Sequence, residues 1–594
     1  MTAPALLLLS PLALDPLFTS LLAGVAGGFI LPKSLALTAG VSLALMWWTW
    51  MTLSRGEFRR GASPLVLAAV LYFVAHAASA AGAKSLNLTL RHFEVFLPYL
   101  AIFLFSSAWM NDDRALGAFL KGLSILGTLF AAHGILQYAG FEFLPARSRY
   151  GVESESYYRV YSTFGNPVLL AEFLALVLMA ALGLAASPAG AKWKPFLLIA
   201  AAAMAACLVL TRSRAAPVSL AAAAAVFVAL STPRAASPLR RRAPAALVLL
   251  LLAATLFAVL RVTGETTMKR RSIVTRTIYW KSTALMAKDH LLQGVGAGNF
   301  RLRYLDYQAR FFDDPRNLKY APYANAEKPN HAHNEYLETA AETGLPGILS
   351  LALLLALFVR GGALLRRREN DDPLAAALFC AALVFWLEMS VGVSLHVPSS
   401  GALFWALMGA AAARMKDGGT VSAKLALQPR RVKWFAGAIV LMLLYSVADH
   451  SYNALRARAL EAEGKKLLAA GDFDAAARRF TESLEIDPAD GETRYLRGAA
   501  HLMLGYASRA VADFRIARMN WDDPILHYNL AMAFFVSGYM GAALDEALTL
   551  ERMTPAHPLA KRMLGMILRE LGNETEADEK FREAFELKRS APPL

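Results

Sequence analysis

Two histidines, an amide and several carboxylates stand together in the stretch KPNHAHNEYLETAAETGLPG. A neutral imidazole can take a proton from an attacking hydroxyl group, which is the task of a general base. With Asn330 (or Asn334) as a helix cap, we expect His331 and His333 in the first turn, where unpaired backbone N–H groups disfavour imidazolium. His333 is the predicted base, and the residues predicted to bind substrate around it are His331, Asn334 and Glu338.

Two other interpretations of this histidine pair stay open. Histidines at a membrane surface often only hydrogen-bond to loop carbonyls. An H-x-H pair also offers two ligands to a metal ion. However, Glu335 and Glu338 would point to different faces of the predicted helix, and no third histidine lies close in sequence. We therefore expect neither a metal ion nor a cofactor.

Long apolar stretches surround these polar groups. The chain of 594 residues is 56% hydrophobic and only 18% charged, a balance that soluble proteins seldom have. Apolar windows of about 17 to 25 residues, each able to cross a ~30 Å hydrocarbon core, recur up to about residue 449. We predict an all-α polytopic membrane protein with about thirteen spans, at residues 5–30, 34–53, 64–83, 93–110, 115–139, 167–186, 194–211, 214–231, 243–261, 345–365, 374–394, 398–414 and 433–449. The first stretch lacks a basic flank and contains Asp15-Pro16, which favours a span over a cleaved signal peptide.

The basic residues indicate which loops face the cytoplasm. A net charge of +15 would suit a nucleic-acid partner, but the Lys and Arg residues gather in alternate short loops. These loops start near residues 54, 232, 366 and 414, and the positive-inside rule makes them cytoplasmic. The count of spans then puts four other segments outside the cytoplasm, at 140–166, 211–214, 262–344 and beyond 449.

Several arginines lie at the edges of these predicted outer segments. Arginine at a membrane edge usually anchors to lipid headgroups, but on the outer side it runs against the positive-inside bias. A bound diphosphate would explain such arginines, because the guanidinium fork matches its oxygens. The candidates are Arg159 with Asn166 before one span, Arg212 and Arg214 in TRSRA, and Arg276 with Trp280 in the long loop. The turn GVGAGNF lacks the context of a nucleotide-binding loop and is not assigned to one.

A repeat appears after residue 452. Gly471, Gly505, Gly538 and Gly572 are spaced 34, 33 and 34 residues apart, and Pro488, Pro524 and Pro555 close the units. A period near 34 with glycine between two helices is typical of tetratricopeptide repeats, which stack into an α-solenoid with a concave groove. The predicted domains are therefore transmembrane helices at 1–261, a periplasmic loop at 262–344, further transmembrane helices at 345–449 and the solenoid at 452–594. Both cysteines, Cys207 and Cys380, fall in predicted spans and form no disulfide framework.

The motifs together resemble the O-antigen ligase superfamily of bacterial membrane glycosyltransferases. His333 and Asn334 are followed by nine residues, Gly344, two residues and Gly347, and this pattern joins TFGNP, TRSRA and R…W…DHLLQGVGAGNF. The resemblance covers roughly residues 60–415, and the solenoid is an addition that leaves the acceptor open. It implies an inner-membrane location with the long loop and the solenoid in the periplasm.

The resemblance also implies a reaction. A glycan leaves undecaprenyl diphosphate for an acceptor hydroxyl, with His333 as base and with Arg214 and Arg276 stabilising the leaving diphosphate; Arg159 and Arg212 rank second. No Asp-x-Asp motif stands in the predicted outer loops between spans, which suits a metal-independent reaction, and a single displacement would invert the anomeric centre. Three aromatic residues of the loop are candidates to stack on sugars, although interfacial aromatic belts explain such residues equally well: Trp280, Tyr304 and Tyr307.

The acceptor and the class of protein stay open. Lipid A core, another glycan repeat and a protein side chain compete as acceptors. A periplasmic solenoid binds peptides or partner proteins. This favours a protein acceptor or the recruitment of an assembly complex, without deciding between them. A transporter or a membrane scaffold that displays the repeats is the alternative outside enzymes. It is less favoured, because transport pathways keep ionisable groups near the membrane midplane and here the polar groups gather at the predicted outer face.

Overall fold

The chain folds into helices that form two compact units in the computed structural model. The described residues are 2–25, 40–48, 51, 57–141, 159–231, 267–324, 328–365, 372–415, 419–424 and 429–590. The first unit comprises Met1–Ala75, Phe93–Gly264 and Leu349–Ser451, and the second comprises His76–His92, Glu265–Ile348 and Tyr452–Leu594. Two of the three pieces of the second unit, 265–348 and 452–594, are segments that the sequence places mainly outside the cytoplasm. The four predicted domains stay a prediction.

The first unit is built around α6 (Pro167–Ala186). This helix is apolar on every face and most of its side chains are buried, as expected for a helix that other helices surround. It packs against α5 (Asp113–Tyr138), α7 (Lys194–Leu210), α8 (Ala215–Ser231) and α13 (Pro373–Glu388). The other helices with residues in this unit are α1 (Ala3–Val25), α3 (Pro64–Ala78), α4 (Leu86–Trp109), α12 (Glu335–Leu365), α14 (Pro398–Arg414) and α15 (Pro429–Ala469), with short 3₁₀ turns at η1 (Ser79–Gly82), η2 (Pro188–Trp193) and η4 (Ser394–His396).

The protein is a multi-pass membrane protein. Among the described residues, six helices are long and apolar enough to cross a membrane, and each overlaps a predicted span: Pro64–Gly82, Leu86–Trp109, Asp113–Tyr138, Pro167–Ala186, Pro188–Leu210 and Glu335–Leu365. The shorter helices α8, α13 and α14 fall on three more predicted spans. The span predicted at 243–261 lies outside the described residues, and the total of about thirteen stays a prediction.

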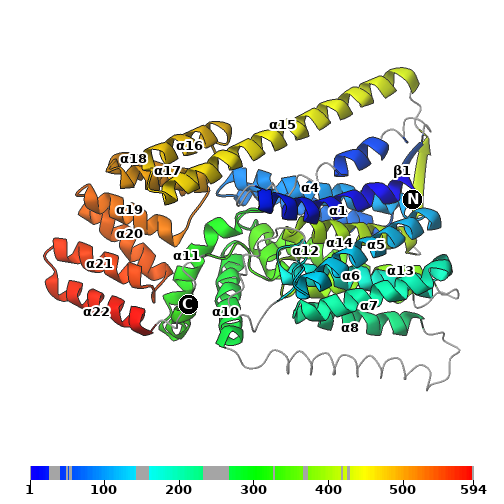
Figure 1. The fold of residues 1–594 in the computed structure, drawn as a ribbon, viewed down its shortest axis with the longest axis horizontal. Helices are drawn as coiled ribbons and strands as arrows, with labels where there is room; N and C mark the ends of the chain where they lie inside the picture. Colours follow the sequence, from blue (N-terminus) through cyan, green and yellow to red (C-terminus); the bar gives the residue numbers. More distant parts are fainter. Residues whose placement is uncertain are drawn as a thin grey trace. The chain divides into compact units, whose positions relative to one another are not determined.

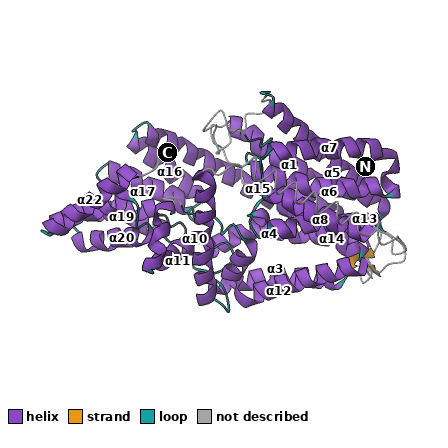
Figure 2. Cartoon of the chain, turned by 90° about the horizontal axis from the view of Figure 1, so that it is seen from below, coloured by secondary structure: helices purple, strands orange, loops and turns teal. Residues whose placement is uncertain are grey.

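A short antiparallel ribbon adds two strands to the otherwise helical fold (Figure 2). Strand β1 (Glu57–Ala62) pairs with β2 (Gly419–Lys424), with Glu57 opposite Lys424 and Ala62 opposite Gly419. The all-α class is confirmed for the membrane helices and the solenoid, and the ribbon was not anticipated. It joins two of the basic loops that the sequence assigns to the same side of the membrane.

The core of the second unit lies in the segment predicted as the long loop. It contains α10 (Thr267–Asp289), α11 (Phe300–Phe312) and the 3₁₀ segment η3 (Pro315–Tyr323), followed by the start of α12. Their apolar side chains form one buried cluster, which includes Phe300, Tyr304 and Phe311. This segment is therefore folded around a buried hydrophobic cluster.

The C-terminal segment forms the predicted solenoid of helical hairpins, which follow one another along the chain (Figure 1). The end of α15 pairs with α16, and the later hairpins follow the same pattern: α16 (Phe473–Ile486), α17 (Gly491–Met503), α18 (Ala507–Ala517), α19 (Pro524–Val536), α20 (Met540–Met553), α21 (Pro558–Glu570) and α22 (Glu574–Ser590). The four repeat glycines adopt φ of +83°, +82°, +78° and +84° between the two helices of each hairpin, where a left-handed residue favours glycine. The glycine period therefore predicted these turns correctly.

The turns between successive repeats pack against the start of α4 and against the loop. The Arg91 guanidinium binds both carboxylate oxygens of Asp487, at 2.7 and 2.6 Å. The Ser85 hydroxyl donates to Asn520 Oδ1 at 2.6 Å. The Gln308 amide donates to the carbonyl oxygen of Met553 at 2.8 Å, and the Met553 side chain is buried in the loop's own cluster. The solenoid thus forms one compact unit with the loop.

Candidate functional site

The helix at the centre of the site starts at Glu335. Asn334 is its cap, because the Asn334 side chain accepts a hydrogen bond from the backbone N–H of Leu337 at 3.0 Å. Of the two predicted caps, Asn334 is therefore the one observed, and both histidines precede the helix. The expectation that they lie in its first turn is wrong. The helix breaks at Gly344 (φ +62°, ψ −155°), where the sequence predicts the break before the span.

His333 sits in a strained position between the end of the loop and this helix. Its backbone has φ of +54°, a conformation that costs a non-glycine residue energy and that clusters at functional sites. The ring lies nearly parallel to that of Tyr279 on α10, with centroids 6.0 Å apart and 15° between the planes. The pKa of His333 is lowered to about 4, chiefly by burial, with further lowering from Arg276 and His331 and an opposing effect from Glu338. The neutral imidazole is as predicted, but burial rather than the helix terminus is its main cause.

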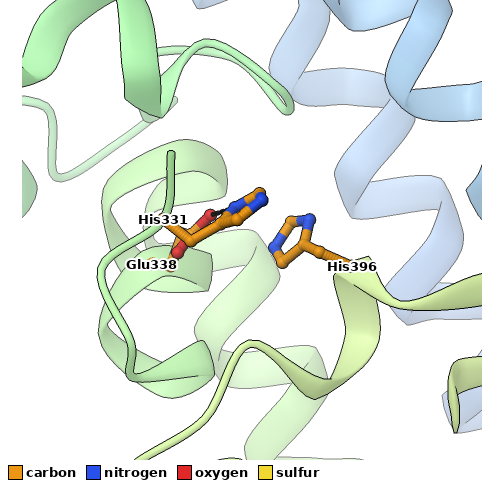
Figure 3. A group of neighbouring side chains, drawn as sticks. All are labelled: His331, Glu338 and His396. Carbon is orange, nitrogen blue, oxygen red and sulfur yellow. Dashed lines mark hydrogen bonds and ion pairs between the residues drawn. The ribbon is translucent and has the colours of Figure 1, made fainter. Parts of the chain in front are cut away.

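His331 forms a pair with a buried carboxylate. Its Nδ1 lies 2.9 Å from Glu338 Oε1, and the two side chains face each other (Figure 3). The second carboxylate oxygen of Glu338 accepts the backbone N–H of Ala332 at 2.6 Å. Glu338 is buried whereas the His331 side chain is 31% exposed. Glu338 thus fixes both the ring of His331 and the backbone that leads to His333.

The glycine turn GVGAGNF packs against the C-terminal end of the same helix. The N–H groups of Val295 and Gly296 donate to the carbonyls of Ala341 and Glu342, each at 2.9 Å. A Cβ on Gly294, whose φ is +70°, would lie 2.1 Å from the Glu342 carbonyl oxygen. The turn requires glycine for this close approach. The observed role of the turn is to pack against this helix.

Several residues that sequence reasoning missed hold this arrangement. The Glu342 carboxylate accepts the N–H of Phe300 at 2.9 Å and so starts α11. The buried Asn299 side chain accepts from the N–H of Ser85 at 2.8 Å and donates to Thr89 at 2.9 Å. Tyr279 lies three residues after Arg276 on α10, a spacing that puts both on one helix face. That spacing was the available signal for Tyr279.

In the first unit, the predicted arginines gather around one turn. The Arg159 guanidinium donates from Nε to the carbonyl of Thr211 at 2.9 Å, which brings it to the turn that carries Arg212 and Arg214. Arg212 adopts φ of +51°, and Arg214 immediately precedes α8. Asn166 caps α6 by accepting from the N–H of Val168 at 2.8 Å.

A glutamine that the sequence did not single out holds the segment between these groups. Gln137 of α5 accepts the N–H groups of Tyr161 and Ser162 at 3.1 and 3.0 Å. The Ser162 hydroxyl in turn donates to the carbonyl of Phe130 at 2.9 Å and lies 3.0 Å from His133 Nδ1. Residues 159–166 are thereby attached to α5, with Arg159 at one end and Asn166 at the other.

The structure corrects part of the prediction for sugar stacking. Tyr304 and Tyr307 are 0% and 4% exposed and belong to the core of the loop, so the expectation that they stack on sugars is wrong. Trp280 is partly buried against the same cluster. The structure thus brings Arg276, His331, His333, Asn334 and Glu338 together in the second unit, and Arg159, Arg212 and Arg214 together in the first. Their roles remain predictions.

Comparisons with known proteins find a family match in the middle of the chain. A family model described as O-Antigen ligase matches residues 199–352, which include both arginines of the TRSRA turn, Arg276 and the whole helix entry. The exopolysaccharide production protein ExoQ of Rhizobium meliloti (strain 1021) is 26% identical over 130 residues, which are 22% of this chain and 28% of that protein. The chain therefore matches little more than a quarter of that relative. The family match confirms the resemblance to the O-antigen ligase superfamily.

Solved structures are also similar to part of the chain. MamA from Desulfovibrio magneticus RS-1 is 21% identical and the match covers 28% of this chain and 92% of that one, with a TM-score of 0.23. YrrB, described as a TPR protein with an unusual peptide-binding site, is 19% identical, with 25% and 84% covered and a TM-score of 0.22. The assignment of the repeats rests on the hairpins described above.

Proposed function

We propose that this member of the O-antigen ligase superfamily is an inner-membrane glycosyltransferase that moves a glycan from undecaprenyl diphosphate to an acceptor hydroxyl on the periplasmic side. One observation carries the proposal. Helix α10 presents Arg276 and Tyr279 to His333, so a permanent cation and an aromatic ring flank an imidazole that is neutral at pH 7. A base for a hydroxyl and a cation for a leaving anion are the two groups that this transfer needs.

The proposed step is a single displacement. The acceptor oxygen forms a bond to the anomeric carbon while its proton passes to His333. The bond between that carbon and the diphosphate oxygen breaks, and the electron pair stays on the lipid diphosphate. The guanidinium of Arg276 stabilises the charge that develops on that oxygen. The displacement inverts the anomeric centre.

The environment of His333 suits a base that is activated by its substrate. A pKa of about 4 keeps the imidazole neutral but makes it a weak base. Arg276 contributes to that low pKa, and a bound diphosphate would neutralise its positive charge. Binding of the donor would therefore raise the pKa of His333 and make proton transfer more favourable when both substrates are present.

The arginine turn of the first unit supplies the second part of the proposal. We assign Arg214 to a lipid-linked diphosphate on the family resemblance, with Arg159 and Arg212 as further contacts. The hydrogen bond from Arg159 to Thr211 supports this assignment, because it concentrates three guanidinium groups at one turn. Guanidinium groups then take the place that a metal ion occupies in many transfers of phosphorylated donors.

Contacts between loops support the proposed topology. Strands β1 and β2 pair loops that are both predicted to be cytoplasmic. Arg414 binds Asp113 at 2.6 Å and Asp372 at 3.3 Å, and all three residues adjoin predicted cytoplasmic loops. The second unit combines 76–92, 265–348 and 452–594, which include two of the four segments that the prediction places outside, most of 262–344 and the part beyond 449. The basic loops assign the inner side.

The acceptor is proposed from the similarity to a protein named for exopolysaccharide production. That name favours another glycan repeat as acceptor, which makes the protein a polymerase, over lipid A core. The solenoid keeps a protein acceptor as the second candidate, because stacked helical repeats offer a surface for polypeptide.

The deciding experiment uses the full chain in lipid vesicles that contain an undecaprenyl-diphosphate-linked glycan and each acceptor in turn. The wild type should yield a transferred product with one acceptor class, and His333→Ala should yield none at an unchanged protein level. His290→Ala is the matched control, since His290 is a partly buried histidine of the same loop that contacts Arg303 rather than the site. Transfer by His333→Ala at the wild-type rate would refute the assignment of the base.

A further inference from the structure

The segment between α10 and α11 is held at the ends of two membrane helices. The carbonyl of Leu291 accepts the N–H of Leu345, at 2.7 Å, where α12 resumes after its break at Gly344. At the other end of the segment, the Asn299 side chain bonds to both the N–H and the carbonyl of Ser85, immediately before α4. Residues 291–299 therefore lie level with the first residues of two spans.

The lengths of these spans place that level at the membrane surface. The 24 residues of α4 rise about 36 Å at 1.5 Å per residue. The part of α12 that follows Gly344 rises about 31 Å by the same measure. The part of α12 after Gly344 is just long enough for a hydrocarbon core of ~30 Å, so Leu345 lies at its boundary. Helix α4 is longer, and because Arg91 in its second turn binds Asp487 of the solenoid, its first turns extend beyond that core.

Two leucines of the segment are exposed at this level. Leu291 and Leu292 are 51% and 73% exposed, whereas Val295 and Ala297 of the same segment are buried. Leu86 and Leu90, one turn apart at the start of α4, are each 58% exposed. Leu291 and Leu292 are therefore an exposed apolar patch of the second unit, bonded through Leu291 to the start of a span.

The surroundings favour a lipid surface as the occupant of this patch. Lys84 lies just before α4 and Lys288 just before the end of α10, and both are exposed. Leucines flanked by exposed lysines are the pattern of segments that lie in the headgroup region, with the apolar side chains below and the ammonium groups among the lipid phosphates.

We propose that Leu291 and Leu292 insert into the outer leaflet of the bilayer and hold the catalytic loop against the membrane surface. The hydrogen bonds that tie this segment to Ala341, Glu342 and Leu345 connect the inserted leucines to the helix that His333 precedes. A loop held in this way keeps its base at the depth of a lipid-bound diphosphate. The insertion itself does not depend on the proposed function.

The test measures the depth of one side chain in the full chain. Cys207 and Cys380, which are both buried, are replaced by alanine, and Leu292→Cys carries a nitroxide spin label in vesicles of phosphatidylethanolamine and phosphatidylglycerol. We expect the label at 292 to collide more with lipid-soluble oxygen than with a water-soluble nickel chelate. The control is Met503→Cys on the solenoid, which is 62% exposed and should show the opposite preference. Equal access of nickel to labels at 292 and 503 would overturn the proposal.

A second variant separates insertion from catalysis. Leu292→Glu should raise the KM for the lipid-linked donor several-fold with little change in kcat, and Leu292→Met should match the wild type. If Leu292→Glu leaves the KM unchanged, the leucines do not hold the loop where the donor lies. If the label at 292 is buried in lipid while His333→Ala still transfers glycan, insertion stands and the proposed function fails.

Discussion

The imidazole of His333 lies nearly parallel to the phenol ring of Tyr279, with 6.0 Å between the ring centroids. Tyr279 and Arg276 stand one turn apart on α10, so a single helix sets both the burial of the imidazole and the charge beside it. Any change in the position of α10 must therefore change the proton affinity of His333. That relationship yields a prediction for the pH dependence of transfer.

The acid limb of kcat/KM should reflect the low pKa of His333. The pKa of His333 is lowered to about 4 from an ordinary value of 6.5. The free protein therefore keeps a neutral imidazole at every pH above about 4. Transfer should therefore persist as the pH falls from 7 to 5. Arg276→Gln removes a positive charge that lowers the pKa, and the acid limb should move to higher pH even though the rate itself falls. A limb that stays at the same pH in Arg276→Gln would show that the two residues are not coupled.

The turn at Gly294 should tolerate no side chain. Gly294→Ala places a Cβ 2.1 Å from the Glu342 carbonyl oxygen at a φ of +70°, whereas the matched Gly572→Ala has φ of +84° and open space around its Cβ. The control should lose only about 1 to 2 kcal/mol for the left-handed backbone. Gly294→Ala should lose a further 1 to 3 kcal/mol, on the order of other overpacked sites. Thermal unfolding in detergent measures both, and equal losses would contradict the close approach.

The contact between the solenoid and the first turns of α4 should behave as an ion pair that can be reversed. Arg91→Asp and Asp487→Arg should each lower stability by about 1 kcal/mol, because both side chains are about one third exposed and solvent screens the pair. The double reversal should recover most of the loss. The control is the same exchange at Arg569 and Asp578, which are more exposed and lie within one hairpin. Limited proteolysis of the loop should rank the variants in the same order of stability. A double variant that is no more stable than the single variants would contradict the pairing.

Local pattern was enough to predict much of this structure. The glycine period located all four hairpin turns, because a left-handed residue between two helices favours glycine in any sequence. Gly344 was identified as the break before a span, and Asn334 was one of two candidates for the cap. Each of these features is set by residues that are neighbours in the chain, so a single sequence contains the information.

Contacts between distant segments could not be predicted from the sequence. Tyr279 is one tyrosine among several in the loop, and only the fold shows that it faces His333 while Tyr304 and Tyr307 fill the core. Glu338 was proposed as a substrate contact, but its pairing with His331 depends on how the chain bends before Glu335. The attachment of the solenoid to the loop through Met553, and to α4 through Asp487, likewise has no signal in the repeat pattern.

Lys328 gives a last test of that attachment, because it is a buried cation three residues before His331. Its ammonium group lies 5.1 Å from the ring centroid of Trp521, which is in the turn between α18 and α19 of the solenoid. The pKa of Lys328 is lowered to about 7, first by burial and then by Arg301, against the opposing charges of Asp523 and Asp522. The ordinary pKa of lysine, near 10.5, applies to the unfolded chain.

These two values fix how stability should depend on pH. Below about pH 7 the lysine is charged in both states and its burial destabilises the folded protein. Between about pH 7 and 10 the folded protein has lost this proton while the unfolded chain keeps it, so unfolding takes up a proton and a rise in pH stabilises the fold. Lys328→Met removes the effect. The unfolding temperature of the wild type should therefore rise relative to that of Lys328→Met across this window.

Lys561 is the matched control for this measurement. It is also largely buried, but Glu551 and Glu583 bind it at 2.7 and 2.5 Å and raise its pKa. Lys561→Met should therefore be less stable than the wild type by a nearly constant amount from pH 7 to 10. If the wild type and Lys328→Met instead give parallel curves, Lys328 is not a desolvated cation. The solenoid would then not exclude water from the segment that leads to His331 and His333.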